Sequence, residues 1–366
     1  MADLQASGAS ITGSSGNNNN NRNPPAIDVK NLPAKRLFKT RDLPSKSIPW
    51  DQVELPVDAL LVTVKECELL SCVSFLNQGF YKSYHKNLGH VYFGKIGEER
   101  NARKIALTTC EMVPNGSTLT VKNTVEKVKP KAVFCVGYCG GLNANKVQLG
   151  DVVISSKLKM YADIKITQNE IQYRGIGVPL KQHLAKLILN ADAGWKPPLK
   201  NDVDLDVNVI KNGVILSGPE VVDNEERRRE LTKQFPDATA IEMEGVGLHA
   251  AARDLDMEWV VIKGVSDFAD GKKSETDAWR PFASVMAASL TAHILSDPIA
   301  FEHVAHYEGS VTKDAQTQTE ITMNDKLFQQ SVFTTSQGDN PDGQSLKEGL
   351  KREAAEDIDQ VAKRRK

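Results

Sequence analysis

The sequence has little net charge and no long apolar run, and both absences exclude whole classes of function. Its 366 residues include 46 basic and 47 acidic side chains, a formal net charge of −1. This balance gives no electrostatic reason to expect a nucleic-acid partner. No apolar run approaches the roughly 20 residues of a membrane-spanning helix, so we predict no membrane partner. The first residues lack a cationic start and an apolar core, and we therefore expect no secretory signal.

Cysteine is also scarce. The chain has five cysteines, an odd number without metal-ligand spacing, which favours a reducing compartment over a disulfide framework. We therefore expect an intracellular protein, cytoplasmic or nuclear. We predict no metal site and no cofactor.

Polar, low-complexity stretches flank the part of the chain that can form a core. Residues 1–45 are rich in Asn, Ser and Gly, and we expect them to be disordered. The tail at 308–366 is similarly polar, and we expect most of it to be disordered too. One compact domain is therefore predicted at residues 50–298.

Apolar runs alternate with helical periodicity inside this domain, which predicts an α/β fold. The runs at 58–64, 132–136 and 259–262 are typical of strands buried on both faces. Around residues 238–267 the order is strand, helix, strand, which predicts a right-handed parallel crossover. In open α/β sheets, ligands bind outside the carboxyl ends of such strands.

Two carboxylates mark the ends of that crossover. Glu244 stands at the start of its helix, and Asp267 follows its second strand, so we expect them to meet at one edge of the sheet. Each residue alone has a structural explanation, as a favourable charge on the helix dipole or as a cap. The combination of Glu-Met-Glu-Gly at 242–245 with Ser266-Asp267 resembles the nucleoside phosphorylase and nucleosidase superfamily. That superfamily includes the methylthioadenosine/S-adenosylhomocysteine nucleosidases.

Further motifs follow in the order of this superfamily. A Glu, here Glu68, follows the first buried strand, and a glycine-rich turn at 137–142 follows a later one. The segment Leu149–Ile154 is similar to the Leu-Gly-Asp-Val-Val segment of the superfamily. The stretch 213–222 resembles its base-binding loop. The resemblance implies a single three-layer domain, with a central mixed, mostly parallel twisted sheet flanked by helices.

The resemblance also implies roles for individual residues. Asp267 would protonate the leaving purine as a general acid, oriented by Ser266. Glu68 would activate the attacking water. The spacing leaves two alternatives open: that Glu66 has this role, or that both residues only occupy the first turn of the helix. Glu244 would bind the ribose hydroxyls, whereas core packing is the alternative for Met243 and a structural role the alternative for Glu242. The full substrate-binding set that we predict is Glu242, Met243, Glu244, Val221, Val222, Cys139, Gly140 and Gly141.

The nucleophile distinguishes two enzyme classes. Members of this superfamily that use phosphate carry an Arg shortly before the glycine-rich turn and a Ser within it, whereas this chain has Cys135 and Tyr138 there. The residues therefore favour water, and with it a purine (adenine) nucleosidase. The substrate would be a nucleoside such as adenosine or methylthioadenosine, or a nucleotide such as AMP or ATP. A phosphate-dependent purine nucleoside phosphorylase is the alternative, and a catalytically silent nucleoside-sensing module is another.

Cations near the predicted pocket segments raise the question of a 5′-phosphate. If they meet a phosphate chain, a nucleotide is the better substrate; if they are solvated surface charges, they say nothing of the substrate. The candidates are Lys65, Arg100, Arg103, Lys157 and Lys159.

The C-terminus carries basic residues in a bipartite pattern. Two basic residues, a ten-residue spacer and four more basic residues are typical of a nuclear-import signal. The alternative is the polar end of a short helix. An import receptor is therefore a candidate partner, bound through Lys351, Arg352, Lys363, Arg364, Arg365 and Lys366. We also expect the chain to form a homo-oligomer.

Overall fold

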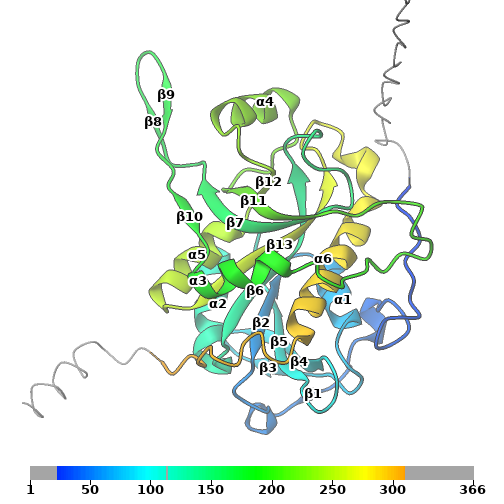
Figure 1. The fold of residues 1–366 in the computed structure, drawn as a ribbon. Coiled ribbons are helices and arrows are strands. Elements are labelled where there is room, and N and C mark those ends of the chain that lie inside the picture. Colours follow the sequence, from blue (N-terminus) through cyan, green and yellow to red (C-terminus); the bar gives the residue numbers. More distant parts are fainter. Residues whose placement is uncertain (1–22, 113, 310–366) are drawn as a thin grey trace, which may run out of the picture. The chain divides into compact units, whose positions relative to one another are not determined.

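A mixed β-sheet with helices on both faces forms the centre of the fold (Figure 1). The computed structural model describes residues 23–112 and 114–309. Strands β2 (Ala59–Thr63), β6 (Ala132–Gly141) and β13 (Glu258–Asp267) lie parallel at its centre. Nearly all their residues are buried, as the continuous apolar runs predicted. The predicted α/β class is confirmed.

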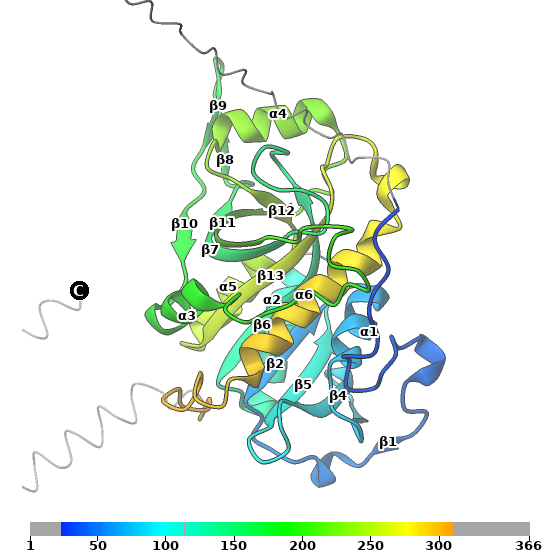
Figure 2. The same ribbon diagram turned by 45° about the vertical axis from the view of Figure 1, so that its right-hand side comes forward.

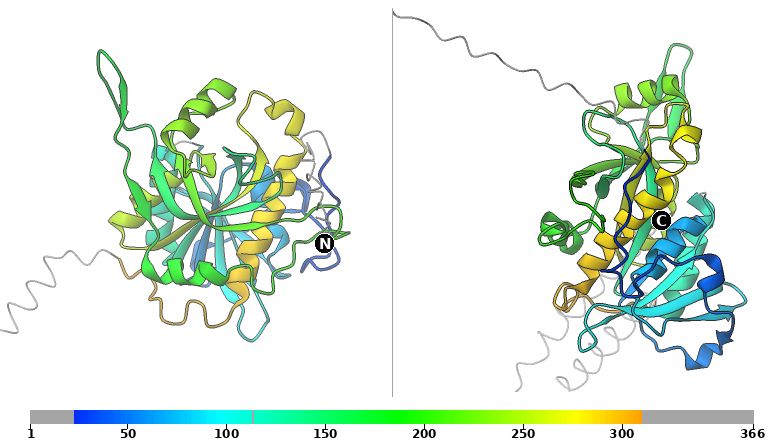
Figure 3. Two further views of the ribbon diagram at one scale, coloured as in Figure 1. Left: turned by 45° about the horizontal axis from the view of Figure 1, so that its top comes forward. Right: turned by 90° about the vertical axis from the view of Figure 1, so that its right-hand side faces the viewer.

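The other strands extend the sheet in both directions from this centre. Beyond β2 come β5 (Arg103–Thr109), β4 (Gly89–Ile96), β3 (Tyr81–His85) and β1 (Ser47–Ile48). Beyond β6 come β12 (Ala240–Glu242), β11 (Val209–Ser217), β7 (Val152–Met160) and β10 (Gly177–Pro179). A separate hairpin, β8 (Ile164–Ile166) and β9 (Ile171–Tyr173), projects away from the sheet (Figure 3).

Helices cover the two faces of the sheet in pairs. The helices α1 (Glu66–Ser74) and α6 (Trp279–Ser296) pack together on one face (Figures 1 and 2). On the other face, α2 (Pro114–Val128) packs against α5 (Gly245–Asp254). Two further helices, α3 (Gln182–Leu187) and α4 (Glu225–Gln234), follow β10 and β11. Within the described ranges, none of the helices combines the length and apolar character that crossing a membrane requires.

The predicted parallel crossover at 238–267 is wrong in its strand directions. Strand β13 runs parallel to β6, but β12 pairs antiparallel with the end of β6, where Ile241 lies opposite Gly140. The glycines that we expected to form a turn continue β6 instead, to Gly141. Because β6 continues through these glycines, it separates β12 from β13 and pairs with both.

The ordered domain is longer at both ends than predicted. Ile27 forms a β-bridge with Leu199, and Leu32 and Phe38 are buried, so the expected disorder is wrong for residues 23–45. At the other end, Phe301 is buried and packs edge-on against Phe134, beyond the predicted boundary. These few buried apolar side chains do not stand out in segments of mostly polar composition. Residues 1–22 and the basic C-terminal motif lie outside the described residues.

Candidate active site

The carboxyl ends of the three central strands meet at one edge of the sheet. Val62 of β2 and Val261 of β13 both pair with Cys135 of β6, so the three strands lie side by side. Strand β2 ends at Thr63, whereas β6 and β13 continue to Gly141 and Asp267. A cavity of about 220 Å³ opens beyond these ends. Nine of the predicted site residues line it: Glu68, Cys139, Gly140, Val221, Val222, Glu242, Met243, Glu244 and Asp267.

The two other predicted site residues lie behind this lining. Ser266 is fully buried and hydrogen-bonds Asp267. Gly141 pairs with Ala240, and a Cβ on Gly141 would lie 3.1 Å from the Phe268 ring. Both residues therefore support the cavity wall from behind.

A larger hollow of about 820 Å³ lies elsewhere, between β3, β4 and β5. Three carboxylates line it, Glu54, Glu98 and Glu99, and Glu54 already pairs with Lys104 at 2.9 Å. None of the predicted site residues is among its described lining residues. The smaller cavity is therefore the better candidate, because it gathers buried ionisable groups.

Backbone amides hold Glu68 in place at the start of α1. Its Oε2 accepts hydrogen bonds from the N–H groups of Val64 and Lys65 at 2.7 and 2.8 Å, and its Oε1 accepts one from Tyr138 at 3.0 Å. Burial raises the pKa of Glu68, with Lys263 opposing the shift. A Cβ on Gly137 would come within 1.9 Å of Oε1, so only glycine leaves room for this carboxylate. Glu66, the alternative, is exposed and accepts a hydrogen bond from Thr40.

A buried lysine that the sequence analysis missed joins two of the predicted carboxylates. The Nζ of Lys263 lies 3.0 Å from Oε2 of Glu244 and 3.9 Å from Oε1 of Glu68. Burial opposes its charged form, but the neighbouring acidic groups, first Cys135 and then Glu244 and Glu68, hold the pKa of Lys263 well above its ordinary value. One signal was available, since Lys263 is a charge directly after the apolar run 259–262 of a strand buried on both faces.

Glu242 fixes the first turn of α5. It accepts hydrogen bonds from the N–H groups of Glu244 and Gly245, each at 2.9 Å. Burial first, and then the charge of Glu244, raises the pKa of Glu242 to about 7. Glu242 therefore positions Glu244 through the backbone at the helix terminus.

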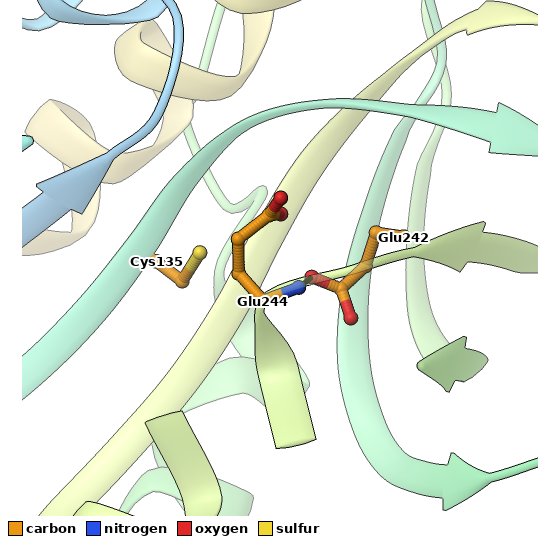
Figure 4. A group of neighbouring side chains, drawn as sticks. All are labelled: Cys135, Glu242 and Glu244. Carbon is orange, nitrogen blue, oxygen red and sulfur yellow. Dashed lines mark hydrogen bonds between the residues drawn. The ribbon is translucent and has the colours of Figure 1, made fainter. Parts of the chain in front are cut away.

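Cys135, Glu242 and Glu244 also form a compact cluster (Figure 4). One ligand atom from each lies within 4.8 Å of the others. The positive charge beside this cluster comes from Lys263, at 3.0 Å from Glu244. Burial raises the pKa of Cys135 well above its ordinary value, as expected for a thiol packed in the core. The cluster is therefore explained as part of a buried ion pair.

Asp267 sits at the end of β13 with partners for either protonation state. Its Oδ1 accepts a hydrogen bond from the N–H of Ala269 at 2.9 Å, and its Oδ2 lies 2.9 Å from Oγ of Ser266. The Ser266 hydroxyl also reaches the carbonyl oxygen of Cys139 at 3.2 Å. When Ser266 donates to the carbonyl oxygen of Cys139, its own oxygen is free to accept a hydrogen bond from protonated Asp267. Burial raises the pKa of Asp267, although Lys273 opposes the shift.

Three cationic side chains line the cavity: Lys65, Lys273 and Arg280. Of the five cations that the sequence suggested for a phosphate, only Lys65 is among them. Arg103 instead hydrogen-bonds the carbonyl oxygen of Pro298, and Lys159 pairs with Asp237 at 2.7 Å. The cation prediction was therefore wrong for four of its five members, which are not among the lining residues.

Proteins of similar sequence include nucleosidases. The chain is 31% identical over 268 residues to a death domain-containing ATP nucleosidase of Amphimedon queenslandica, covering 68% of this chain and 50% of that protein. It thus spans about half the length of that relative. It is 27% identical over 188 residues to the 5′-methylthioadenosine/S-adenosylhomocysteine nucleosidase of Staphylococcus epidermidis, covering 51% of this chain and 77% of that enzyme.

Solved structures share the fold. The Neisseria meningitidis 5′-methylthioadenosine/S-adenosylhomocysteine nucleosidase, in complex with methylthio-immucillin-A, matches with a TM-score of 0.54 at 20% identity, over 65% of this chain and 98% of that one. The futalosine hydrolase of Helicobacter pylori matches with a TM-score of 0.54 at 18% identity, over 66% of this chain and 98% of that one. The family model described as the phosphorylase superfamily matches residues 66–296, well over half of the sequence. The chain therefore belongs to the phosphorylase superfamily.

Proposed function

We propose that this protein is an adenine nucleosidase, which hydrolyses the N-glycosidic bond of an adenine nucleoside or nucleotide to free base and sugar. The observation that carries the proposal is the immobilised Glu68 carboxylate, facing a cavity that also contains Glu244 and Asp267. The named relatives, an ATP nucleosidase and a methylthioadenosine/S-adenosylhomocysteine nucleosidase, support the same reaction class.

The leaving base requires a proton. Asp267 would donate it, because a carboxylic acid shielded from water retains its proton closer to neutral pH. Ser266 would support Asp267 before and after the transfer, by accepting from the acid and donating to the carboxylate. Val221 and Val222 would contact the purine. Gly140 and Cys139 lie beside Asp267 and would allow the close approach of the base.

The sugar develops positive charge as the bond breaks. Glu244 would bind the ribose hydroxyls and stabilise this charge electrostatically, with Met243 against the sugar face. Lys263 balances Glu244 and Glu68 when no substrate is bound, so that two carboxylates can remain ionised in a buried place. Glu68, with its pKa raised by burial, would then accept a proton from the attacking water.

The same geometry disfavours a phosphorylase. An inorganic phosphate would need the amides of the glycine-rich segment, but the N–H of Tyr138 already donates to Glu68. A fixed carboxylate at that point also repels an anionic nucleophile. A water molecule is neutral and is not repelled by this carboxylate.

Base release in phosphate-free buffer tests this proposal. We expect the purified chain to release adenine from at least one of adenosine, methylthioadenosine, AMP and ATP, measured by chromatography. The variant Glu68→Gln should reduce the rate by about 10²–10⁴-fold, because an amide cannot accept the proton of water. A strict requirement for phosphate would favour the phosphorylase. No release from any of the four would leave the nucleoside-sensing module.

We also propose nuclear entry through the basic C-terminal motif, which lies outside the described residues. Clustered Lys and Arg offer a charged strip to an acidic receptor groove. The test compares the cellular distribution of the tagged chain with that of a variant in which residues 363–366 are Ala. Identical distributions would contradict an import signal. The expected homo-oligomer stays a prediction.

A further inference from the structure

The chain turns back directly after β13, and this turn brings an N–H group and an ammonium group to one oxygen of Asp267. Ala269 has a φ of 53°, a left-handed conformation that is uncommon outside glycine, and its N–H donates to Oδ1 of Asp267 at 2.9 Å. Gly271, with a φ of 85°, turns the backbone a second time. The Nζ of Lys273 then lies 3.9 Å from the same Oδ1. Backbone conformations of this kind gather at functional sites, which makes the turn a candidate for a role in the reaction.

Lys273 is placed between the buried carboxylate and the open cavity. The side chain of Lys273 is 21% exposed and that of Asp267 only 4%, and both residues line the cavity. Within the part of the chain that the structure describes, Asp267 is the acidic partner of Lys273. The preceding residue, Lys272, is exposed and is not among the described lining residues. The turn therefore directs one of two adjacent lysines to Asp267.

The other charged groups near Asp267 have less influence on it. Arg280 of α6 also favours the ionised form of Asp267, but it acts more weakly than Lys273. From β6, Cys139 contributes a buried thiol, whose pKa burial raises. The remaining charged groups of the cavity lining are Lys65, Glu68, Glu220, Glu242 and Glu244. The four acids among them are held by other cations or by backbone amides. Lys273 is thus the main charge that acts on Asp267.

The reaction proposed above makes Asp267 negative as it proceeds. The O–H bond of Asp267 breaks and its electron pair stays on the carboxylate. A lone pair of the purine forms the new N–H bond, and the purine also keeps the electron pair of the glycosidic bond. A cation fixed beside Asp267 therefore interacts more strongly in the transition state than in the ground state. Because Ala269 and Lys273 both face Oδ1, the proton is left to Oδ2, beside Ser266.

We propose that Lys273 is a positioning residue for the general acid: it confines the transferable proton to Oδ2 of Asp267 and stabilises the carboxylate that remains. This inference rests on the proposed nucleosidase function. Burial raises the pKa of Asp267 and Lys273 opposes that shift, so removal of the lysine moves the pKa further upward. Asp267 would then be a weaker acid that keeps its proton to a higher pH.

The pH profile of kcat for adenine release tests this role. In Lys273→Met the plateau should fall by about tenfold, a modest factor because the lysine is partly exposed. Its alkaline limb should move to higher pH, whereas Lys273→Arg keeps the charge and should keep the limb. Lys272→Met is the matched control and should change neither. An unmoved limb in Lys273→Met would overturn the proposal even if kcat falls, because damage to the fold alone lowers activity without changing the proton affinity of Asp267.

A direct titration of Asp267 separates this role from the reaction. The carboxyl carbon signal can be followed by NMR in the chain labelled with carbon-13 and assigned by its loss in Asp267→Asn. Its midpoint should move to higher pH in Lys273→Met and stay in place in Lys272→Met. If no adenine is released but the midpoint moves, the nucleosidase proposal fails and the control of Asp267 by Lys273 stands. If adenine is released and neither midpoint nor limb moves, the role of Lys273 fails and the nucleosidase stands.

Discussion

Replacing Asp267 with Asn should reduce adenine release by about 10²–10⁴-fold, the usual contribution of a general acid. The amide has no acidic proton to give to the leaving base. It can nevertheless keep the native hydrogen bonds, since its oxygen accepts from the N–H of Ala269 and its nitrogen donates to Oγ of Ser266. Loss of activity should therefore come without loss of the fold.

Two measurements on the purified variant make this prediction decisive. Thermal unfolding should give a midpoint close to that of the wild type, and turnover should be followed as adenine released. The variant Ser266→Ala is a graded comparison: it retains the acid but removes the group that supports it, so its loss should be smaller. A folded Asp267→Asn protein with full activity would remove Asp267 from the mechanism.

The second large effect is expected at Lys263. Changing it to Met removes the positive charge between Glu68 and Glu244 and leaves two buried carboxylates without their partner. Breaking a buried ion pair from one side typically lowers the free energy of unfolding by about 3–5 kcal/mol. The loss should be greater at higher pH, because burial raises the pKa of Glu68 and Lys263 opposes that shift, so without Lys263 the ionisation of Glu68 costs more stability. Chemical denaturation at several pH values measures both the loss and its direction.

A lysine in an accessible ion pair provides the control. Lys211 pairs with Asp192 at 2.7 Å, with both side chains about one third exposed. Lys211→Met should change the free energy of unfolding by at most about 1 kcal/mol. Equal stability of the Lys263→Met variant and the wild type at alkaline pH would mean that Lys263 does not balance these carboxylates.

The sequence predicted the convergence of the carboxylates better than the path of the chain. Glu68, Glu244 and Asp267 line one cavity, as expected from their places at strand and helix ends. The parallel crossover used to argue this is wrong, because β12 runs antiparallel to the end of β6. Local sequence patterns indicate where a strand ends. They do not show with which strand it pairs or in which direction. The glycines of β6 could be interpreted as a turn or as a strand, and only the pairing of Gly140 and Gly141 with β12 decides between them.

The cationic side chains show a second limit of prediction from the sequence. Lys263 was missed because an apolar run predicts a buried strand without showing which charge such a strand can bury. Arg280 belongs to the helix after Asp267, and only tertiary packing places it over Tyr138. Arg103 and Lys159 are also cations close in sequence to the predicted pocket segments, but their side chains bind Pro298 and Asp237. Likewise, the apolar anchors Leu32 and Phe38 are too sparse to identify an ordered segment from composition.

The identity of the nucleophile is the most direct test of the account. Turnover of an adenine nucleotide or nucleoside in water enriched in oxygen-18, followed by mass spectrometry of the sugar product, shows which oxygen attacks the sugar carbon. We expect a free sugar with one labelled oxygen at that carbon, at a rate that added inorganic phosphate does not increase. A sugar 1-phosphate, formed only when phosphate is supplied and without the label at the glycosidic oxygen, would contradict hydrolysis and the role given to Glu68.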